Sequence, residues 1–152
     1  MRVTTRTNLA LRVLMSCAVQ RDTLIKTAEI AESCNCSVHH AAHVVQRLQA
    51  SGVLATVRGR AGGLRLARPV EAISIGSVVR EFEADIPLAE CFNPETNTCP
   101  LVSACRLRSY LARAIEAFYH ELDQITLHDL VEGNCGLYEL LGARPVAPGC
   151  AG

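Results

Sequence analysis

Three cysteines carry the chemistry that the sequence suggests most directly. Cys91, Cys99 and Cys105 are separated by seven and by five residues within one short stretch of chain. Thiolates are ligands for iron–sulfur clusters and zinc, and they are also the reactive form in redox chemistry. Because Arg106 and Arg108 flank the predicted start of a long helix, in whose first turn Cys105 would lie, positive charge and the helix dipole favour a thiolate there. The pattern predicts a metal or redox centre.

The spacing favours an iron–sulfur cluster over zinc. Structural zinc sites usually pair cysteines two to four residues apart and close with a fourth Cys or His, which is not evident here. Three thiolates on a loop leave one iron with a weaker or replaceable ligand, as a sensor requires. Zinc, and redox-active or merely buried thiols, are the alternatives that the spacing leaves open.

The elements that must position these residues begin with three helices, predicted over about residues 7–20, 28–33 and 38–51. Ser37 would cap the third, in which Val38, Ala41, Val45 and Leu48 form one apolar stripe. An apolar β-branched run (53–57), a turn rich in Gly and Arg (58–63) and an alternating run (64–68) then predict a β-hairpin. Helices followed by a hairpin are the order of a winged helix-turn-helix domain, so the predicted fold is mostly α with a small β-hairpin wing.

Such a domain would read double-stranded DNA with its third helix and its wing. The candidate DNA contacts are all side chains able to donate hydrogen bonds: Ser37, His39, His40, His43 and Arg47 on the helix, and Arg58, Arg60 and Arg65 on the wing. His39 and His43 lie one helical turn apart and could instead hold a metal ion, although no third ligand is evident nearby. Cys17 is predicted to be a core residue, and Cys34 and Cys36 packing or capping residues.

The distribution of charge agrees with a DNA-binding first half. The 152-residue chain has a formal net charge of zero, but residues 1–70 hold ten Lys/Arg against three Asp/Glu, and residues 71–152 hold five against twelve. A basic half suggests contact with a polyanion, although chance asymmetry between two solvated halves would look the same.

A second long helix is predicted over about residues 104–126. Its apolar residues recur every three or four positions, at Leu107, Leu111, Ala114, Phe118, Leu122 and Ile125. This stripe is too long for a small domain to cover, so a partner copy of the same helix is expected, with packing on its own domain as the alternative. The predicted organisation is a DNA-binding domain (1–82), a cluster-binding loop (83–106), a dimerisation helix with a short following helix (104–134) and a flexible tail (135–152).

Six segments resemble the family of iron–sulfur winged-helix transcriptional repressors: RTNLALR (6–12), VRGRAGGLRL (57–66), ECF (90–92), NTCPL (97–101), CRL (105–107) and TLHDLV (126–131). The resemblance covers nearly the whole chain except the tail. It implies a homodimer with crossed long helices and a cluster, [4Fe–4S] rather than [2Fe–2S], on the three cysteines near the dimer interface. The residues of the three cysteine segments most resemble those of the nitric-oxide-sensing members, with the iron-responsive members second.

Two positions bear on the fourth ligand that this resemblance implies. In members that regulate cluster assembly, a His three residues after the third cysteine completes the set of cluster ligands. Arg108 occupies that position here, which disfavours membership in that group. In some nitric-oxide sensors the other subunit supplies an Asp from the first helix. The matching residue is Asn8, a weaker ligand, and the iron-responsive members tend to have Asn there.

The sequence thus predicts a cytoplasmic, cluster-dependent repressor that loses its operator when nitric oxide reacts with the cluster. An iron-responsive or redox-responsive repressor is the nearest alternative. An iron–sulfur electron carrier or redox protein is a different class, against which stands the lack of a nucleotide fingerprint, a nucleophile–base motif or a second cluster. We expect no enzyme activity. No apolar run approaches the roughly 18 residues of a membrane span, and the polar, basic start of the chain does not resemble a signal peptide.

Overall fold

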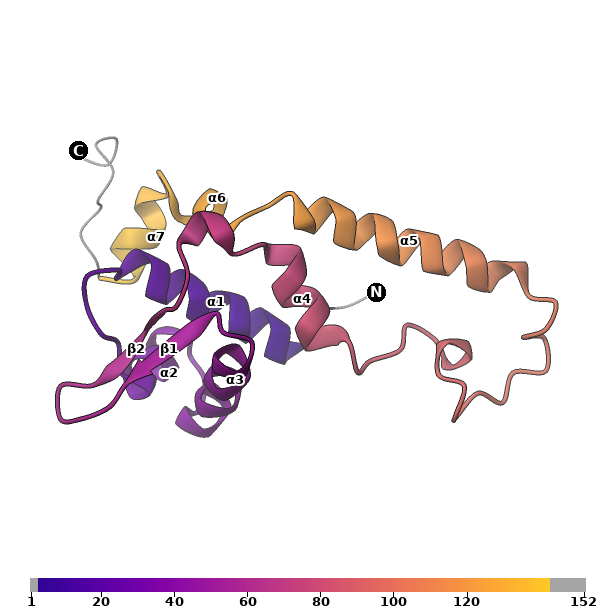
Figure 1. The fold of residues 1–152 in the computed structure, drawn as a ribbon, viewed down its shortest axis with the longest axis horizontal. Coiled ribbons are helices and arrows are strands. Elements are labelled where there is room, and N and C mark those ends of the chain that lie inside the picture. Colours follow the sequence, from indigo (N-terminus) through magenta and orange to yellow (C-terminus); the bar gives the residue numbers. More distant parts are fainter. Residues whose placement is uncertain (1–2, 143–152) are drawn as a thin grey trace.

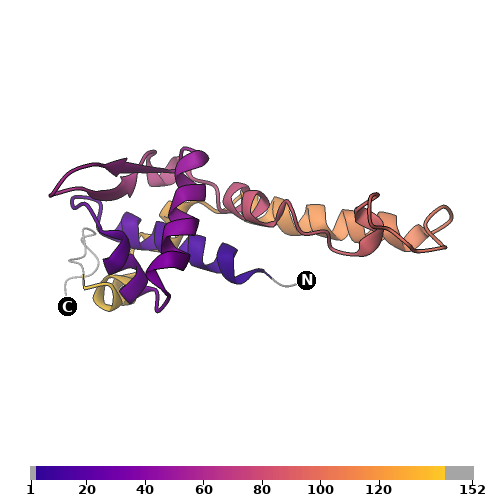
Figure 2. The same cartoon turned by 90° about the horizontal axis from the view of Figure 1, so that it is seen from below.

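A computed structural model of the chain describes residues 3–142, which form a helical body and a long arm (Figure 1). The body contains three N-terminal helices, a two-stranded hairpin and three further short helices. The arm consists of the loop 84–105, which runs outward from the body, and helix α5 (Arg106–Asp123), which runs back beside it. The view from below shows the same division, with the arm projecting from one end of the body (Figure 2).

The first three helices are α1 (Thr5–Val19), α2 (Thr27–Ser33) and α3 (Val38–Ala50), close to the ranges that the sequence predicts. Ser37 caps α3 as predicted, because its hydroxyl oxygen accepts a hydrogen bond from the His40 amide at 3.2 Å. Gly52 follows α3 with a φ of 69°, a conformation in which glycine is favoured. Ala41, Val44, Val45 and Leu48 are buried, whereas Val38, expected in the buried stripe, is 54% exposed.

The predicted wing is present. Strand β1 (Leu54–Val57) pairs antiparallel with β2 (Gly63–Leu66), with Leu54 opposite Leu66. A Cβ at Gly63 would lie 2.9 Å from the Ile25 carbonyl oxygen, so glycine permits the close approach of the hairpin to the segment before α2. Leu64 is buried and exchanges two backbone hydrogen bonds with Ile25, which fixes the hairpin on the body.

The 3₁₀ turn η1 (Val70–Ala72) leads into α4 (Ile75–Glu83), and α6 (Leu127–Val131) and α7 (Cys135–Leu140) complete the body. Leu14, Ile30, Leu48 and Leu127, from four different helices, are each fully buried in one core. The mostly helical fold with a small wing is therefore confirmed. Of the helices in residues 3–142, none is long and apolar enough to cross a membrane.

The structure differs from the sequence prediction at the start of the expected flexible tail. Residues 135–140 form helix α7, which Asn134 caps with its side-chain oxygen, and Tyr138 is only 1% exposed in the core. The segment is short and rich in small residues, so its periodicity was too weak to reveal one deeply buried aromatic side chain. The remainder of the predicted tail, residues 143–152, lies outside the described residues.

Candidate DNA-binding surface and cysteine loop

Helix α3 presents a face of histidines to solvent. Ser37, His39, His40 and His43 are all exposed, and the rings of His39 and His43 meet edge to face with centroids 4.6 Å apart. The hydroxyl oxygen of Ser37 accepts the capping hydrogen bond, so its hydroxyl proton remains available for donation. The exposed Val38 adds an apolar group at the N-terminal end of this face. The arrangement suits a helix whose N-terminal turns enter a major groove.

Arg47 does not lie on that face. Its Nη2 donates a hydrogen bond to the backbone carbonyl of Glu81, and its guanidinium carbon lies 5.0 Å from the centroid of the Phe82 ring. The same Nη2 is 3.4 Å from a carboxylate oxygen of Asp85. The sequence placed Arg47 among the DNA contacts because helical spacing alone put it at the edge of the polar side, but tertiary packing directs it to α4.

The wing offers three unpartnered cations. Arg58 and Arg60 are exposed in the turn and Arg65 is exposed on β2, and within residues 3–142 none of them makes a hydrogen bond or ion pair. The turn depends on Gly62, since a Cβ there would overlap the carbonyl oxygen of Val57. The wing and α3 lie on the side of the body opposite α6 and α7 (Figure 1), so the two predicted DNA-contacting elements share one side.

The three cysteines of the loop are all half-buried free thiols. Cys91 lies in the single turn η2 (Glu90–Phe92), and Cys99 follows a turn in which its amide donates to the Asn97 side-chain oxygen at 3.1 Å. Cys105 is the N-cap of α5, one position before the first turn in which the sequence placed it. Its thiol therefore lies at the N-terminal end of an 18-residue helix.

This donor set fits an iron–sulfur cluster by its chemistry, since it consists of three thiols on an irregular loop with one at a helix N-terminus. The structure nevertheless does not bring the three together. Within residues 3–142 there is no group of three Cys, His, Asp or Glu side chains that could hold a metal ion. Binding of a cluster therefore requires the loop 84–105 to close around it.

Asn8, the predicted fourth ligand, lies exposed on α1 and is connected to the turn before α3. Its side-chain oxygen accepts a hydrogen bond from Arg12 Nε at 3.0 Å. Arg12 Nη1 in turn donates to the Cys34 carbonyl oxygen at 2.6 Å. A displacement of Asn8 would therefore act on the segment that leads into α3.

Cys17, Cys34 and Cys36 have the environment of packing residues. Cys17 and Cys34 are buried, and burial, with a smaller effect of the neighbouring Cys34, raises the pKa of the Cys17 thiol to about 12. Burial is also the largest cause of the raised pKa of Cys36, again with a smaller contribution from Cys34. Protonated thiols are poor nucleophiles and poor metal ligands.

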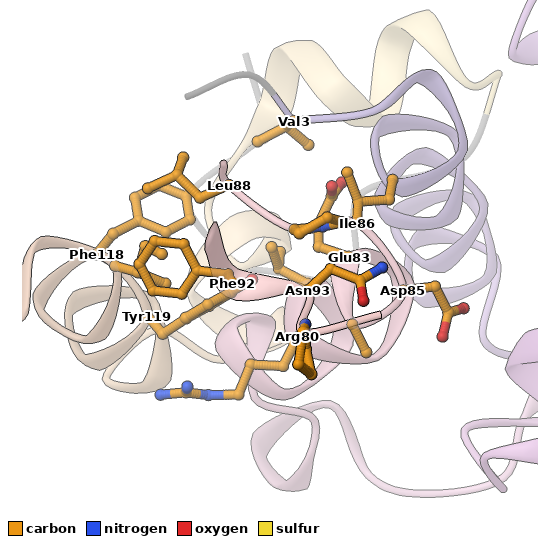
Figure 3. Close-up of a pocket in the computed structure, with 15 residues that line it drawn as sticks. Val3, Arg80, Glu83, Asp85, Ile86, Leu88, Phe92, Asn93, Phe118 and Tyr119 are labelled. Atoms are coloured by element: carbon orange, nitrogen blue, oxygen red, sulfur yellow. The ribbon is translucent and has the colours of Figure 1, made fainter. Parts of the chain in front are cut away.

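A cavity that the sequence did not predict lies where the loop leaves the body (Figure 3). Its volume is about 720 Å³, and it lies between the end of α4, the first part of the loop and α5. Figure 3 shows Phe92, Phe118 and Tyr119 gathered on one side of it and Ile86 on another. The only sequence signal was the presence of apolar residues such as Ile86 in a polar loop.

Helix α5 is divided in its packing. Phe118 and Leu122 near its C-terminal end, and Ile125 just after it, are half-buried against the body, as the alternative of packing on its own domain expects. Towards the tip of the arm, Leu107 and Tyr110 are each 62% exposed, and no residue of α5 is fully buried. The outer half of the stripe is therefore an uncovered apolar surface in the single chain.

Comparisons with known proteins agree with this architecture. A family model described as "Rrf2: Iron-dependent Transcriptional regulator" matches residues 3–133. The HTH-type transcriptional regulator NsrR of Halalkalibacterium halodurans is 40% identical over 146 residues, which is 95% of this chain and 100% of the relative. The HTH-type transcriptional repressor NsrR of Streptomyces coelicolor is 45% identical over 138 residues, 90% and 92% of the two chains.

Among solved structures, the oxidized form of CymR from Staphylococcus aureus is similar, with 28% identity and a TM-score of 0.68. The similarity covers 87% of this chain and 97% of that one. These relatives are regulators rather than enzymes, and the matched region includes the wing, the cysteine loop and α5.

Proposed function

This chain belongs to the Rrf2 family of transcriptional regulators, and we propose that it is a homodimeric repressor whose affinity for operator DNA depends on an iron–sulfur cluster that nitric oxide disrupts. That it is a DNA-binding transcriptional regulator and not an enzyme follows from its family. The observation that carries the finer proposal is the coexistence of a wing and recognition helix with three free thiols on one loop.

The DNA-binding part of the proposal rests on exposed donors. His39, His40 and His43 would meet base edges or phosphates in the major groove, and Arg58 and Arg60 would reach phosphates or the minor groove beside it. Two copies related by a twofold axis would place two such helices on half-sites about one DNA turn apart.

The dimer in this proposal is held by α5. Its outer stripe, which includes the exposed Leu107 and the half-buried Leu111, would pack against the same stripe of a second copy. The outer half of α5 gains little from its own domain, because Leu107 and Tyr110 remain 62% exposed, so burial against a partner is the natural source of its stability.

Cys91, Cys99 and Cys105 would hold the cluster, which we propose to be [4Fe–4S], and Asn8 of the second copy would occupy or approach the fourth site. The cluster would supply iron atoms that react with nitric oxide. The protein's own part is to close the loop 84–105, to present three thiolates, and to connect Asn8 through Arg12 to the turn before α3. A change in coupling of ~3 kcal/mol would alter operator affinity roughly 150-fold.

Iron is the second candidate signal. The family description names iron dependence, and an amide at position 8 binds iron more weakly than a carboxylate would, so that loss of the cluster under iron starvation becomes easier. Under this candidate the same residues act, but an iron chelator replaces nitric oxide as the trigger.

The test is an anaerobic titration of the purified protein with nitric oxide, followed by visible absorption and by binding to an operator selected from genomic fragments. Bleaching of a cluster band together with loss of operator affinity would support the nitric-oxide sensor. A cluster that ignores nitric oxide but is lost to a chelator would support the iron candidate. Absence of any chromophore after anaerobic reconstitution would contradict both.

The matched variants are Cys99→Ala and Cys17→Ala. Cys99→Ala should remain folded and lose the cluster and tight operator binding together, whereas Cys17→Ala removes a buried packing thiol and should lose some stability but keep the cluster. Tight operator binding by a cluster-free Cys99→Ala protein would contradict the proposal.

A further inference from the structure

Arg47 joins the recognition helix to the end of α4. It lies in the last turn of α3. Its side chain is only 32% exposed, whereas the histidines of the same helix are all exposed. It makes three contacts with one short segment: a hydrogen bond to the Glu81 carbonyl, a stacking contact 5.0 Å from the Phe82 ring centroid, and a 3.4 Å approach to Asp85.

The first of these contacts completes the end of a helix. The last carbonyls of a helix have no backbone donor within it, and α4 ends at Glu83. The guanidinium of Arg47 therefore caps the Glu81 carbonyl, and its positive charge lies at the negative end of the α4 dipole. The contact therefore ties α3 to the last turn of α4.

That last turn is a junction of four parts of the molecule. Glu83 accepts hydrogen bonds from Thr4 and Thr7 at the start of α1. Arg80 donates to Asp123 of α5 at 2.8 Å and lies over the Tyr119 ring at 4.3 Å. The loop that carries the three cysteines begins at the next residues, 84 and 85, and therefore starts beside the Arg47 contacts.

We propose that Arg47 is a positioning residue and not a DNA contact: it sets the tilt of α3 against the last turn of α4, and so transmits the state of the loop 84–105 to the recognition helix. This inference rests on the proposed function. Asp85, whose side chain is 80% exposed, contributes little by itself, and the capping bond and the Phe82 contact carry the link.

The salt dependence of operator binding separates positioning from contact. Loss of one contact between the protein and a phosphate makes the slope of log affinity against log salt less steep by about 0.9. Arg47→Ala should weaken operator binding by about tenfold, the effect of one charge-assisted hydrogen bond, with an unchanged slope. The matched control Arg65→Ala, on the exposed wing, should make the slope less steep by about 0.9.

A conservative variant and a double mutant sharpen the test. Arg47→Lys keeps the charge but loses the planar group that caps and stacks, so it should behave like Arg47→Ala, whereas a phosphate contact would survive the change. Arg47→Ala combined with Asp85→Ala should be no weaker than Arg47→Ala alone, because the carboxylate of Asp85 acts only through Arg47.

The decisive readout is the ratio of operator affinity between cluster-loaded and cluster-free protein, which a merely structural role would not change. We expect Arg47→Ala to bind the cluster with the wild-type spectrum and to show a ratio about tenfold smaller than that of the wild type, because only the cluster-loaded form uses the link. A lowered salt slope, full recovery by Arg47→Lys, or a ratio equal to that of the wild type would overturn the inference. A wild type whose own ratio is one would instead contradict the proposed function, and the slope would still decide whether Arg47 touches DNA.

Discussion

Glu83, the last residue of α4, binds Thr4 at the start of α1 twice: one carboxylate oxygen accepts from the Thr4 amide at 2.8 Å and from the Thr4 hydroxyl at 2.9 Å. The same oxygen accepts from the Thr7 hydroxyl. Burial alone would raise the pKa of Glu83, but these hydrogen bonds outweigh it and hold the pKa below its usual 4.5. One carboxylate thus fixes the entry of the chain against the base of the arm.

Replacement of Glu83 by Ala should therefore lower the free energy of unfolding at neutral pH by about 2 kcal/mol, since two hydroxyls and an amide lose a charged acceptor. A folded-state pKa that is depressed contributes stability that is present above pH 4.5 and is lost as the pH falls through the folded value. The difference between wild type and variant, measured by urea unfolding, should shrink below pH 4.5. Glu81→Ala, whose carboxylate has no hydrogen bond or ion pair within residues 3–142, is the control; an equal loss in both variants would contradict this account.

Gly76 allows α4 to approach α5. A Cβ at this position would lie 2.6 Å from the Asp123 amide nitrogen and would overlap its carboxylate, which Arg80 holds. Gly76→Ala should destabilise the fold by about 2–3 kcal/mol through overpacking, as thermal unfolding would measure. At Gly136 in α7 a Cβ meets nothing within 4 Å, so Gly136→Ala should be neutral or slightly stabilising. Equal effects at the two glycines would refute the packing argument.

The wing arginines should govern the salt dependence of DNA binding. Arg58→Ala combined with Arg60→Ala should flatten the slope of log affinity against log salt by up to ~2 units, since each phosphate contact contributes about 0.9. Fluorescence anisotropy with operator DNA between low and moderate salt provides the slope. Arg113→Ala, which removes an exposed cation from the arm, should leave it unchanged. If the double variant keeps the wild-type slope, the wing does not touch phosphate.

Leu107 should be necessary for association of two copies. It is 62% exposed in the single chain, so Leu107→Asp leaves the fold of the body intact while placing a charge in the proposed α5–α5 contact. Light scattering after gel filtration should show a dimer for the wild type and a monomer for the variant, with operator affinity reduced. Two residues along a helix turn by about 200°, so Ser109→Asp on the opposite side should remain dimeric. A dimeric Leu107→Asp protein would exclude this surface.

The thiols of the body and of the loop should differ in reactivity. Burial and, less, the neighbouring Cys34 raise the pKa of Cys17 to about 12, whereas Cys91, Cys99 and Cys105 are half-buried on an irregular loop. In cluster-free, folded protein at pH 8, iodoacetamide should modify the three loop cysteines before Cys17, as peptide mass spectrometry would show. Protein unfolded in guanidinium provides the reference in which these residues react alike. Early modification of Cys17 under native conditions would contradict its placement in the core.

The sequence predicted the elements whose signals are local. Helical periodicity, the Ser37 cap, the glycine after α3 and the alternating run around Leu64 each depend on neighbouring residues, and the structure reproduces each of them. The three cysteines could also be selected from the chain alone, because thiol ligands are recognised by residue type and spacing. The apolar stripe of α5 is too long for a small domain to cover, and this feature of the sequence likewise identified the helix as a candidate interface.

Tertiary structure decided what depends on direction and on distance along the chain. Helical spacing placed Arg47 near the DNA-facing side, but whether its long side chain turns to solvent or to α4 depends on Glu81 and Phe82, more than thirty residues away. The same holds for the bonds from Glu83 to Thr4, and for Tyr138, whose burial orders a segment that local signals predicted to be flexible. Local sequence determines which elements can form, whereas contacts between distant residues determine which side chains remain free to meet DNA, because a side chain satisfied by a partner within the fold is no longer available to a ligand.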